Sequence, residues 1–163
     1  MRKINALTVV AAMCWAAGVL AAPPKSYTID HEIKFEPGDS KWTARLRNTA
    51  AVGDLVDYEY MIALEDLNDD QKPEVIVMAS SSDFCGSGGC SMVVLEDRGS
   101  GRLNPILQQY VTPPLAVTRE KQGGYRLLAI SNGKGGIEIA DRPGAPMHGK
   151  PFVWAMQPVA VTR

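Results

Sequence analysis

Residues 58–97, YEYMIALEDLNDDQKPEVIVMASSSDFCGSGGCSMVVLED, combine three apolar runs with two specialised loops. In the first run one set of alternate residues is large and apolar, and the intervening set begins and ends with glutamate, which is typical of a half-buried strand. The second and third runs have no polar interruption, as expected of central strands covered on both faces. Because short loops join these runs, we expect Tyr58–Leu64, Glu74–Ala79 and Ser91–Leu95 to be neighbouring strands of one sheet.

The segments on either side of this stretch extend the β pattern. A short helix is predicted from Asp39 or Ser40 to Arg47, because an N-cap residue precedes Trp42 and Leu46 at i, i+4 spacing. Residues 103–111 predict a strand that stops at the Pro113-Pro114 pair, with Pro105 indicating an edge position. The predicted fold class is mostly β, a small antiparallel sheet or sandwich with one or two short helices.

The first 21 residues have the features of a secretory signal peptide. Arg2 and Lys3 precede an apolar segment of about 15 residues, and Ala21 supplies the small residue before the cleavage point. A spanning helix needs about 20 apolar residues, so a membrane anchor is not expected. Processing as a lipoprotein at Cys14 is disfavoured because Met13 stands where a small residue is required. We therefore predict a periplasmic or secreted protein, with residues 22–163 forming a single β-rich domain.

The charge of the exported chain disfavours two classes of partner. Loss of Arg2 and Lys3 leaves 15 basic residues against the 18 acidic residues of the full sequence, a net charge of about −3. No basic patch or run is present in the sequence. Nucleic acid and anionic membrane are therefore not expected as partners.

Two cysteines, Cys85 and Cys90, remain after removal of the signal peptide. Oxidising compartments favour disulfides, and the glycine-rich residues 86–89 are flexible enough to let the two side chains meet. We expect a disulfide that fixes the shape of the loop and contributes only about 2 kcal/mol, because the ring is small. A zinc site is the alternative, but His31 and His148 lack ligand spacing.

The loop at residues 66–74, DLNDDQKPE, places oxygen atoms at alternate positions. Calcium binds six to eight oxygen ligands, and a tight loop that turns every second side chain inward can supply most of them. The proposed ligands are the side chains of Asp66, Asn68, Asp70 and Glu74 and the backbone carbonyl of Lys72. Asp69 is expected to point outward. The alternative is an acidic hairpin turn in which Asp and Asn side chains bond to their own backbone.

The pattern D-x-N-x-D-x-x-x-E followed by an apolar strand resembles the calcium loops of FG-GAP/VCBS-type β repeats. Together with the residues 84–90, FCGSGGC, it is also similar to a loose group of small exported bacterial proteins of unassigned function. The resemblance covers about 25 residues and implies a calcium-binding β domain. One departure is Gln71, which stands where these loops have a glycine with positive φ, at a cost of about 1 kcal/mol.

Motifs of common enzyme classes were not found, so an enzyme is not expected. The sequence has no Gly-x-Ser-x-Gly elbow, and Cys85 and Cys90 lack the C-x-x-C spacing of thiol oxidoreductases. The leading hypothesis is a binding or inhibitor module that acts on an unidentified protein, such as a cell-wall hydrolase. Its partner-binding loop would comprise Phe84, Gly86, Ser87, Gly88 and Gly89. The alternative is an envelope enzyme acting on cell-wall carbohydrate, with acidic residues near the calcium loop as catalysts.

Overall fold

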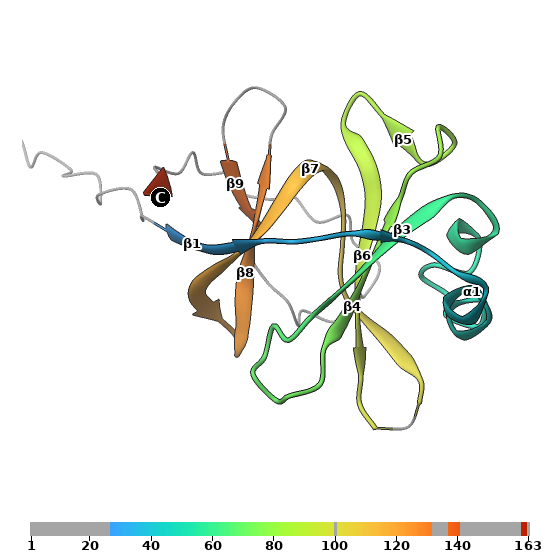
Figure 1. Ribbon diagram of the computed structural model, residues 1–163, viewed down its shortest axis with the longest axis horizontal. Coiled ribbons are helices and arrows are strands. Elements are labelled where there is room, and N and C mark those ends of the chain that lie inside the picture. The colour runs from blue at the N-terminus through green and yellow to red at the C-terminus, as the bar shows by residue number, and fades with distance from the viewer. Residues whose placement is uncertain (1–26, 100, 132–136, 141–160, 163) are drawn as a thin grey trace, which may run out of the picture.

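The computed structural model describes residues 27–99, 101–131, 137–140 and 161–162, and Figure 1 shows how they are arranged. The predicted signal peptide lies outside these residues, as does most of the segment 141–163. The elements in chain order are β1 (Tyr27–Glu32), β2 (Glu36–Pro37), α1 (Ser40–Leu46), the 3₁₀ helix η1 (Leu55–Asp57), β3 (Tyr60–Glu65), β4 (Glu74–Ala79), β5 (Cys85–Gly86), β6 (Gly89–Asp97), β7 (Leu103–Gln122), β8 (Tyr125–Ser131), β9 (Ile137–Ala140) and β10 (Val161–Thr162).

The mostly-β prediction is confirmed, because the strands form one curled, largely antiparallel sheet in the order β10-β1-β7-β6-β4-β3-β2. The three strands predicted to be neighbours are β3, β4 and β6. Val77 pairs with Ile62 on one side and with Val93 on the other, both antiparallel. The first strand begins two residues later than expected, at Tyr60, because Tyr58 terminates η1 instead.

Both faces of β4 are covered, as the uninterrupted apolar run at residues 75–78 predicts, and every residue of the strand, Glu74 included, is buried. Val75, Val77 and Ala79 pack in one cluster, whereas Ile76 and Met78 pack in another. The first cluster lies under α1 and η1 and also contains Leu46, Val52, Leu55, Val56, Tyr60, Ile62, Val93, Leu95 and Leu103. The second lies where the sheet curls over itself and includes Ile33, Met92, Val94, Leu115, Val117, Leu128 and Ile130.

Helix α1 forms as its sequence predicts. The Asp39 carboxylate caps it by accepting the backbone N–H of Trp42 at 2.8 Å, which satisfies one of the free donors at the helix start. Leu46 is fully buried against the sheet and Trp42 packs beside the same cluster. Within the described residues, no helix has the length and apolar composition needed to cross a membrane.

The strand predicted to stop before Pro113-Pro114 is much longer, since β7 continues through both prolines. Its first part pairs with β6 up to Val111, and its second part pairs with β8 from Thr112 onward. The prolines lie between Thr112 and Leu115, where the register shifts, so the ladder needs no hydrogen bond from them there. Pro105 lies beside a second register shift, between Val94 and Leu95 of β6, which is another position that tolerates proline.

Candidate functional site

The acidic loop connects β3 to β4, and its side chains hold its own backbone in place. Asp66 accepts the N–H groups of Asp70 at 3.2 Å and Gln71 at 2.9 Å. Asn68 Oδ1 also accepts the Asp70 N–H, at 2.9 Å, and Asp70 Oδ1 accepts that of Lys72 at 2.8 Å. These bonds are what the acidic-turn alternative predicts. They are compatible with metal binding as well, because each carboxylate keeps further lone pairs free.

Two residues of the loop have left-handed backbone conformations. Gln71 has φ of 69°, so the turn requires positive φ where the resembling calcium loops place glycine. Asp69 has φ of 61°, which the sequence pattern did not predict. Asp and Asn tolerate this region better than most residues, whereas Gln has no such advantage. The turn therefore has positive φ at Gln71, the position where the resembling calcium loops place glycine.

Glu74 is the buried member of the loop, with 2% of its surface exposed. Its Oε2 atom accepts the Leu67 N–H at 2.8 Å, which closes the two ends of the loop on each other. Burial raises the pKa of Glu74 to about 7, and the negative charges of Asp70 and Asp66 add to the shift. The three carboxylates therefore act electrostatically on one another, and a bound cation would relieve that repulsion.

The residues of this loop fit a calcium ion in chemistry, since all the side chains proposed as ligands present oxygen atoms. In the described part of the chain, no three His, Cys, Asp or Glu side chains lie close enough together to form a metal-binding group. The carboxylates of Asp66 and Asp70 can still raise the pKa of Glu74, because electrostatic repulsion acts over longer distances than metal coordination. The Lys72 carbonyl, the other proposed ligand, belongs to the same turn.

Two further residues lie beside the acidic loop, and the sequence patterns indicated neither. The hydroxyl of Tyr125, at the start of β8, donates a hydrogen bond to Glu96 at the end of β6. Burial and this carboxylate raise the pKa of Tyr125 to about 12, while Asn68 of the loop acts in the opposite direction. No pattern in the sequence links the two residues, because only the pairing of β6, β7 and β8 brings them together.

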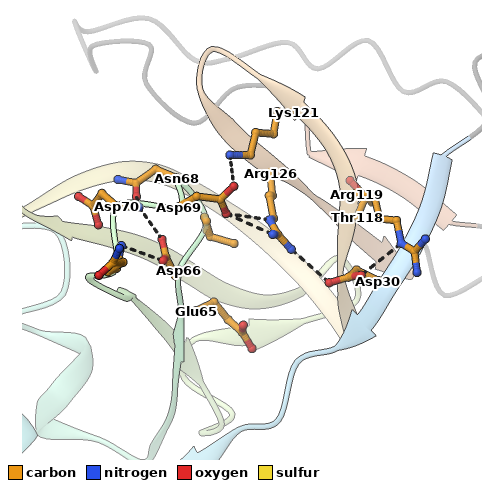
Figure 2. Close-up of polar contacts among 12 residues, drawn as sticks. Asp30, Glu65, Asp66, Asn68, Asp69, Asp70, Thr118, Arg119, Lys121 and Arg126 are labelled. Carbon is orange, nitrogen blue, oxygen red and sulfur yellow. Dashed lines mark hydrogen bonds and ion pairs between the residues drawn. The ribbon is translucent and has the colours of Figure 1, made fainter.

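Asp69 points away from the loop, as predicted, and connects the loop to strands β7 and β8 (Figure 2). Its carboxylate forms ion pairs with Lys121 of β7 and, at 3.2 Å, with Arg126 of β8. Arg126 also contacts Asp30 of β1 at 3.1 Å, and Asp30 in turn contacts Arg119 at 3.2 Å. In addition, the backbone N–H of Arg126 donates to the Leu67 carbonyl at 2.7 Å. The acidic loop is thus held by contacts with β7 and β8 as well as by hydrogen bonds among its own residues.

His31 forms a separate polar contact between β1 and β3. Its Nε2 atom lies 2.9 Å from Glu65 and its Nδ1 atom 3.2 Å from Asp30. The hydrogen bond with Glu65 is the main cause that raises the pKa of His31, and the contact with Asp30 contributes in the same direction, although burial opposes both. The imidazolium therefore stabilises the fold at low pH and loses that effect as the pH rises.

This contact predicts a pH-dependent stability difference between the wild type and His31→Gln. Because the folded pKa is raised, the stabilisation is complete below the unfolded pKa of about 6.5 and disappears as pH rises through the folded value. The side chain is 44% exposed, so we expect no more than about 1 kcal/mol. Urea unfolding of both proteins at pH 5.5 and pH 8.5 measures it. A larger wild-type advantage at pH 8.5 would contradict the assignment.

The second specialised loop is a β5–β6 hairpin closed by a Cys85–Cys90 disulfide. The two cysteines lie directly opposite each other, 4.0 Å apart at Cα, and the next pair is Gly86 with Gly89. Ser87 and Gly88 therefore form an exposed two-residue turn. The disulfide pairing predicted from the sequence is present, and it joins neighbouring strands rather than distant parts of the chain.

We expect the intact mass of exported protein to be two hydrogens below that of the reduced chain, with Cys85 linked to Cys90. Peptide mapping without reduction locates the bond. Cys85→Ser should lower the free energy of unfolding by no more than about 2 kcal/mol, because the ring closes so few residues. Two free thiols in exported protein would contradict this prediction, and a much larger loss would show that the hairpin depends on the bond for more than loop closure.

The predicted partner-binding loop divides into an exposed tip and an internal anchor. Gly86, Ser87 and Gly88 are exposed, and a Cβ atom built on either glycine would meet nothing within 4 Å. Gly89, by contrast, has φ of 105°, and a Cβ there would lie 2.3 Å from the Val111 carbonyl oxygen. Gly89 therefore allows its own chain, rather than a partner, to approach closely.

Aromatic side chains flank the disulfide-closed hairpin. The half-buried Phe84 ring packs edge-on against Tyr58, with the ring centroids 5.2 Å apart. Phe84 precedes β5, and its carbonyl accepts the Ser91 N–H at 2.9 Å, while Ser91 pairs with Tyr110 of β7. Phe84 packs against the cluster that contains Val93, and Ser91, Val93 and Tyr110 share that face of the sheet. Tyr58 is 50% and Tyr110 69% exposed.

Compared with protein-family models, with characterised proteins and with solved structures, the chain matches none of them.

Proposed function

We propose that this protein is an exported binding or inhibitor module that acts through protein–protein contact at its disulfide-closed hairpin. The observation that carries the proposal is the row formed by Tyr58, Phe84 and Tyr110 beside that hairpin. Exposed tyrosines are common at the centres of protein interfaces, because their rings bury a large area at a small cost in conformational entropy. A domain that exposes two of them next to a rigid loop has an arrangement suited to recognition.

The rigidity of this surface supports the same proposal. The disulfide fixes the hairpin, and Gly89 lies in close contact with the Val111 carbonyl. Phe84 packs against the core cluster that lies under α1 and η1. A preformed binding surface loses little conformational entropy when a partner docks. Ser87 and Gly88 form the exposed tip of the hairpin.

Calcium at the acidic loop belongs to this proposal as a stabilising ion rather than as a catalyst. Asp66, Asn68, Asp70 and Glu74 supply the side-chain oxygen atoms, and the Lys72 carbonyl supplies one more. The positive φ at Gln71 and the repulsion felt by buried Glu74 support a cation at this position. Extracellular modules bind calcium with dissociation constants of about 10⁻⁴–10⁻³ M, so a site weakened by Gln71 still suits an exported protein.

Comparison of three immobilised proteins in an envelope extract tests the partner-binding proposal. Wild type and the control Leu64→Ser should retain the same protein, because Leu64 is equally exposed but lies at the other end of β3. The double variant Tyr58→Ser/Tyr110→Ser should no longer retain this protein. If the partner is a cell-wall hydrolase, wild type should inhibit it stoichiometrically. Equal retention by all three would contradict the assignment of this surface, and release of peptidoglycan fragments by the purified protein alone would support the envelope-enzyme alternative.

A further inference from the structure

A groove of about 320 Å³ lies on the helix-bearing face, at the end of the sheet opposite the disulfide hairpin. Its apolar wall is formed by Trp42 of α1, Leu64 of β3, and Pro73 and Val75 at the start of β4. The β6–β7 connection, which Figure 1 shows at the opposite end of the sheet from β5, borders the groove through Gly99 and Gly101. Ligand pockets have volumes of about 300–1,000 Å³, so this groove lies at the small end of their range.

The groove exists because α1 is too short to cover the whole face. Tyr60 and Ile62 of β3 are buried beneath the helical segments, but Leu64 on the same side of the strand is 49% exposed. Its cross-strand partner Val75 is nevertheless buried and forms the floor. Among the described residues, only Tyr58 and Tyr110 are comparably exposed large apolar side chains, and both belong to the aromatic row at the other end.

The rim of the groove carries a fixed guanidinium group. Arg45 lies over the Trp42 ring, with its Cζ atom 5.1 Å from the ring centroid, and pairs with Asp97 at 2.9 Å. The other oxygen of Asp97 accepts the Gly99 N–H at 2.9 Å, so that carboxylate is engaged on both sides. Because only one terminal nitrogen of Arg45 contacts Asp97, the guanidinium retains N–H donors for a ligand.

A second cation, the Lys72 ammonium, also borders the groove. Lys72 lines it, and among the described residues no carboxylate forms an ion pair with the Lys72 ammonium. The backbone of Lys72 is held by the 2.8 Å bond from its N–H to Asp70, which fixes the base of the side chain beside Pro73. Two cations and one engaged carboxylate thus border an apolar wall, in a chain whose overall charge is slightly negative.

We propose that this groove binds a small apolar molecule that carries a carboxylate. The apolar body would lie against Trp42, Leu64 and Val75, and the carboxylate would meet the Lys72 ammonium and the free N–H groups of Arg45. The apolar body would cover exposed apolar surface of the chain. The carboxylate would pair with the Lys72 ammonium and with those N–H groups of Arg45 that do not contact Asp97.

Octanoate is a suitable probe, with 1-octanol as its uncharged counterpart of the same length. Binding is followed by NMR through the indole N–H of Trp42. We expect octanoate to bind about tenfold more tightly than octanol, and Lys72→Gln to reduce this preference to less than about threefold. Lys72→Gln keeps the backbone N–H that bonds Asp70, so it should fold normally. Leu64→Asn should weaken both ligands, whereas Tyr110→Ser, at the other end of the face, should weaken neither.

The titrations are run in EDTA and again in calcium, because Lys72 belongs to the acidic loop. The two conditions distinguish ligand binding in the groove from calcium binding in the loop, because the preference for octanoate is expected both with and without calcium. Equal affinity for octanoate and octanol would overturn the proposal, as would a preference that survives Lys72→Gln. The proposal is equally overturned if the Trp42 signal does not shift at 10 mM octanoate, or if shifts spread equally over the disulfide hairpin.

Discussion

Calcium at ten times its dissociation constant is expected to raise the free energy of unfolding of the wild type by about 1.4 kcal/mol, and that of Asp70→Ala not at all. The ion would bind the folded loop and not the unfolded chain, so mass action favours the folded state. It would also relieve the repulsion of buried Glu74 by Asp70 and Asp66. For a domain of this size the effect corresponds to roughly 5 °C in the thermal midpoint, which calorimetry in EDTA and in 10 mM calcium measures.

Asp69→Ala is the matched control, because it removes the same charge one residue away. Its carboxylate points out of the loop toward Lys121 and Arg126. The variant should therefore melt somewhat below the wild type in EDTA, since it loses these ion pairs, and should still respond to calcium. A midpoint of the wild type that stays constant up to 10 mM calcium would identify the loop as an acidic turn held only by its own backbone.

Replacement of Gly89 by alanine should destabilise the fold by about 3 kcal/mol, the largest effect expected of any single methyl group in the hairpin. Two causes act together. The φ of 105° is strained for any residue with a side chain, and the new Cβ would lie 2.3 Å from the Val111 carbonyl oxygen. Because backbone rather than a flexible side chain blocks the position, β6 and β7 must separate there. Urea unfolding of the exported, oxidised proteins measures the loss.

Gly88→Ala provides the comparison within the same hairpin, because a Cβ at Gly88 meets nothing within 4 Å. Its stability should stay within about 0.5 kcal/mol of the wild type. In the pull-down, Gly89→Ala should also retain less partner, since displacement of the hairpin moves Phe84 relative to Tyr110. If the two variants were equally stable, the close packing of Gly89 against β7 would not describe the protein in solution.

The parts of the fold that local sequence predicts are those whose contacts lie within a few residues. The unbroken apolar sequence of β4 predicts burial on both faces, and the whole strand is buried. Asp39 caps α1 three residues before its bonding partner Trp42. The acidic loop is similar, since Asp66 bonds to the N–H groups of Asp70 and Gln71.

Local patterns were insufficient where a distant strand changes the environment of a segment. Consecutive prolines normally end a strand, yet β7 passes through Pro113 and Pro114 because its partner changes from β6 to β8 there. Tyr58 continues the alternation of β3 in sequence, but η1 ends at that point and leaves the ring exposed against Phe84. In both cases the deciding contacts are made by a neighbouring element of the fold, and the alternation of apolar residues does not report them.

The sequence by itself therefore determined the fold class, the three central strands and the disulfide, because each rests on periodicity or on a bond across fewer than ten residues. Only the tertiary structure decided which residues surround these features. Asp69 meets Lys121 and Arg126, 52 and 57 residues away, and Trp42, Leu64 and Lys72 line the same groove. Such contacts depend on how the sheet curls and where α1 ends, and sequence spacing carries no information about either.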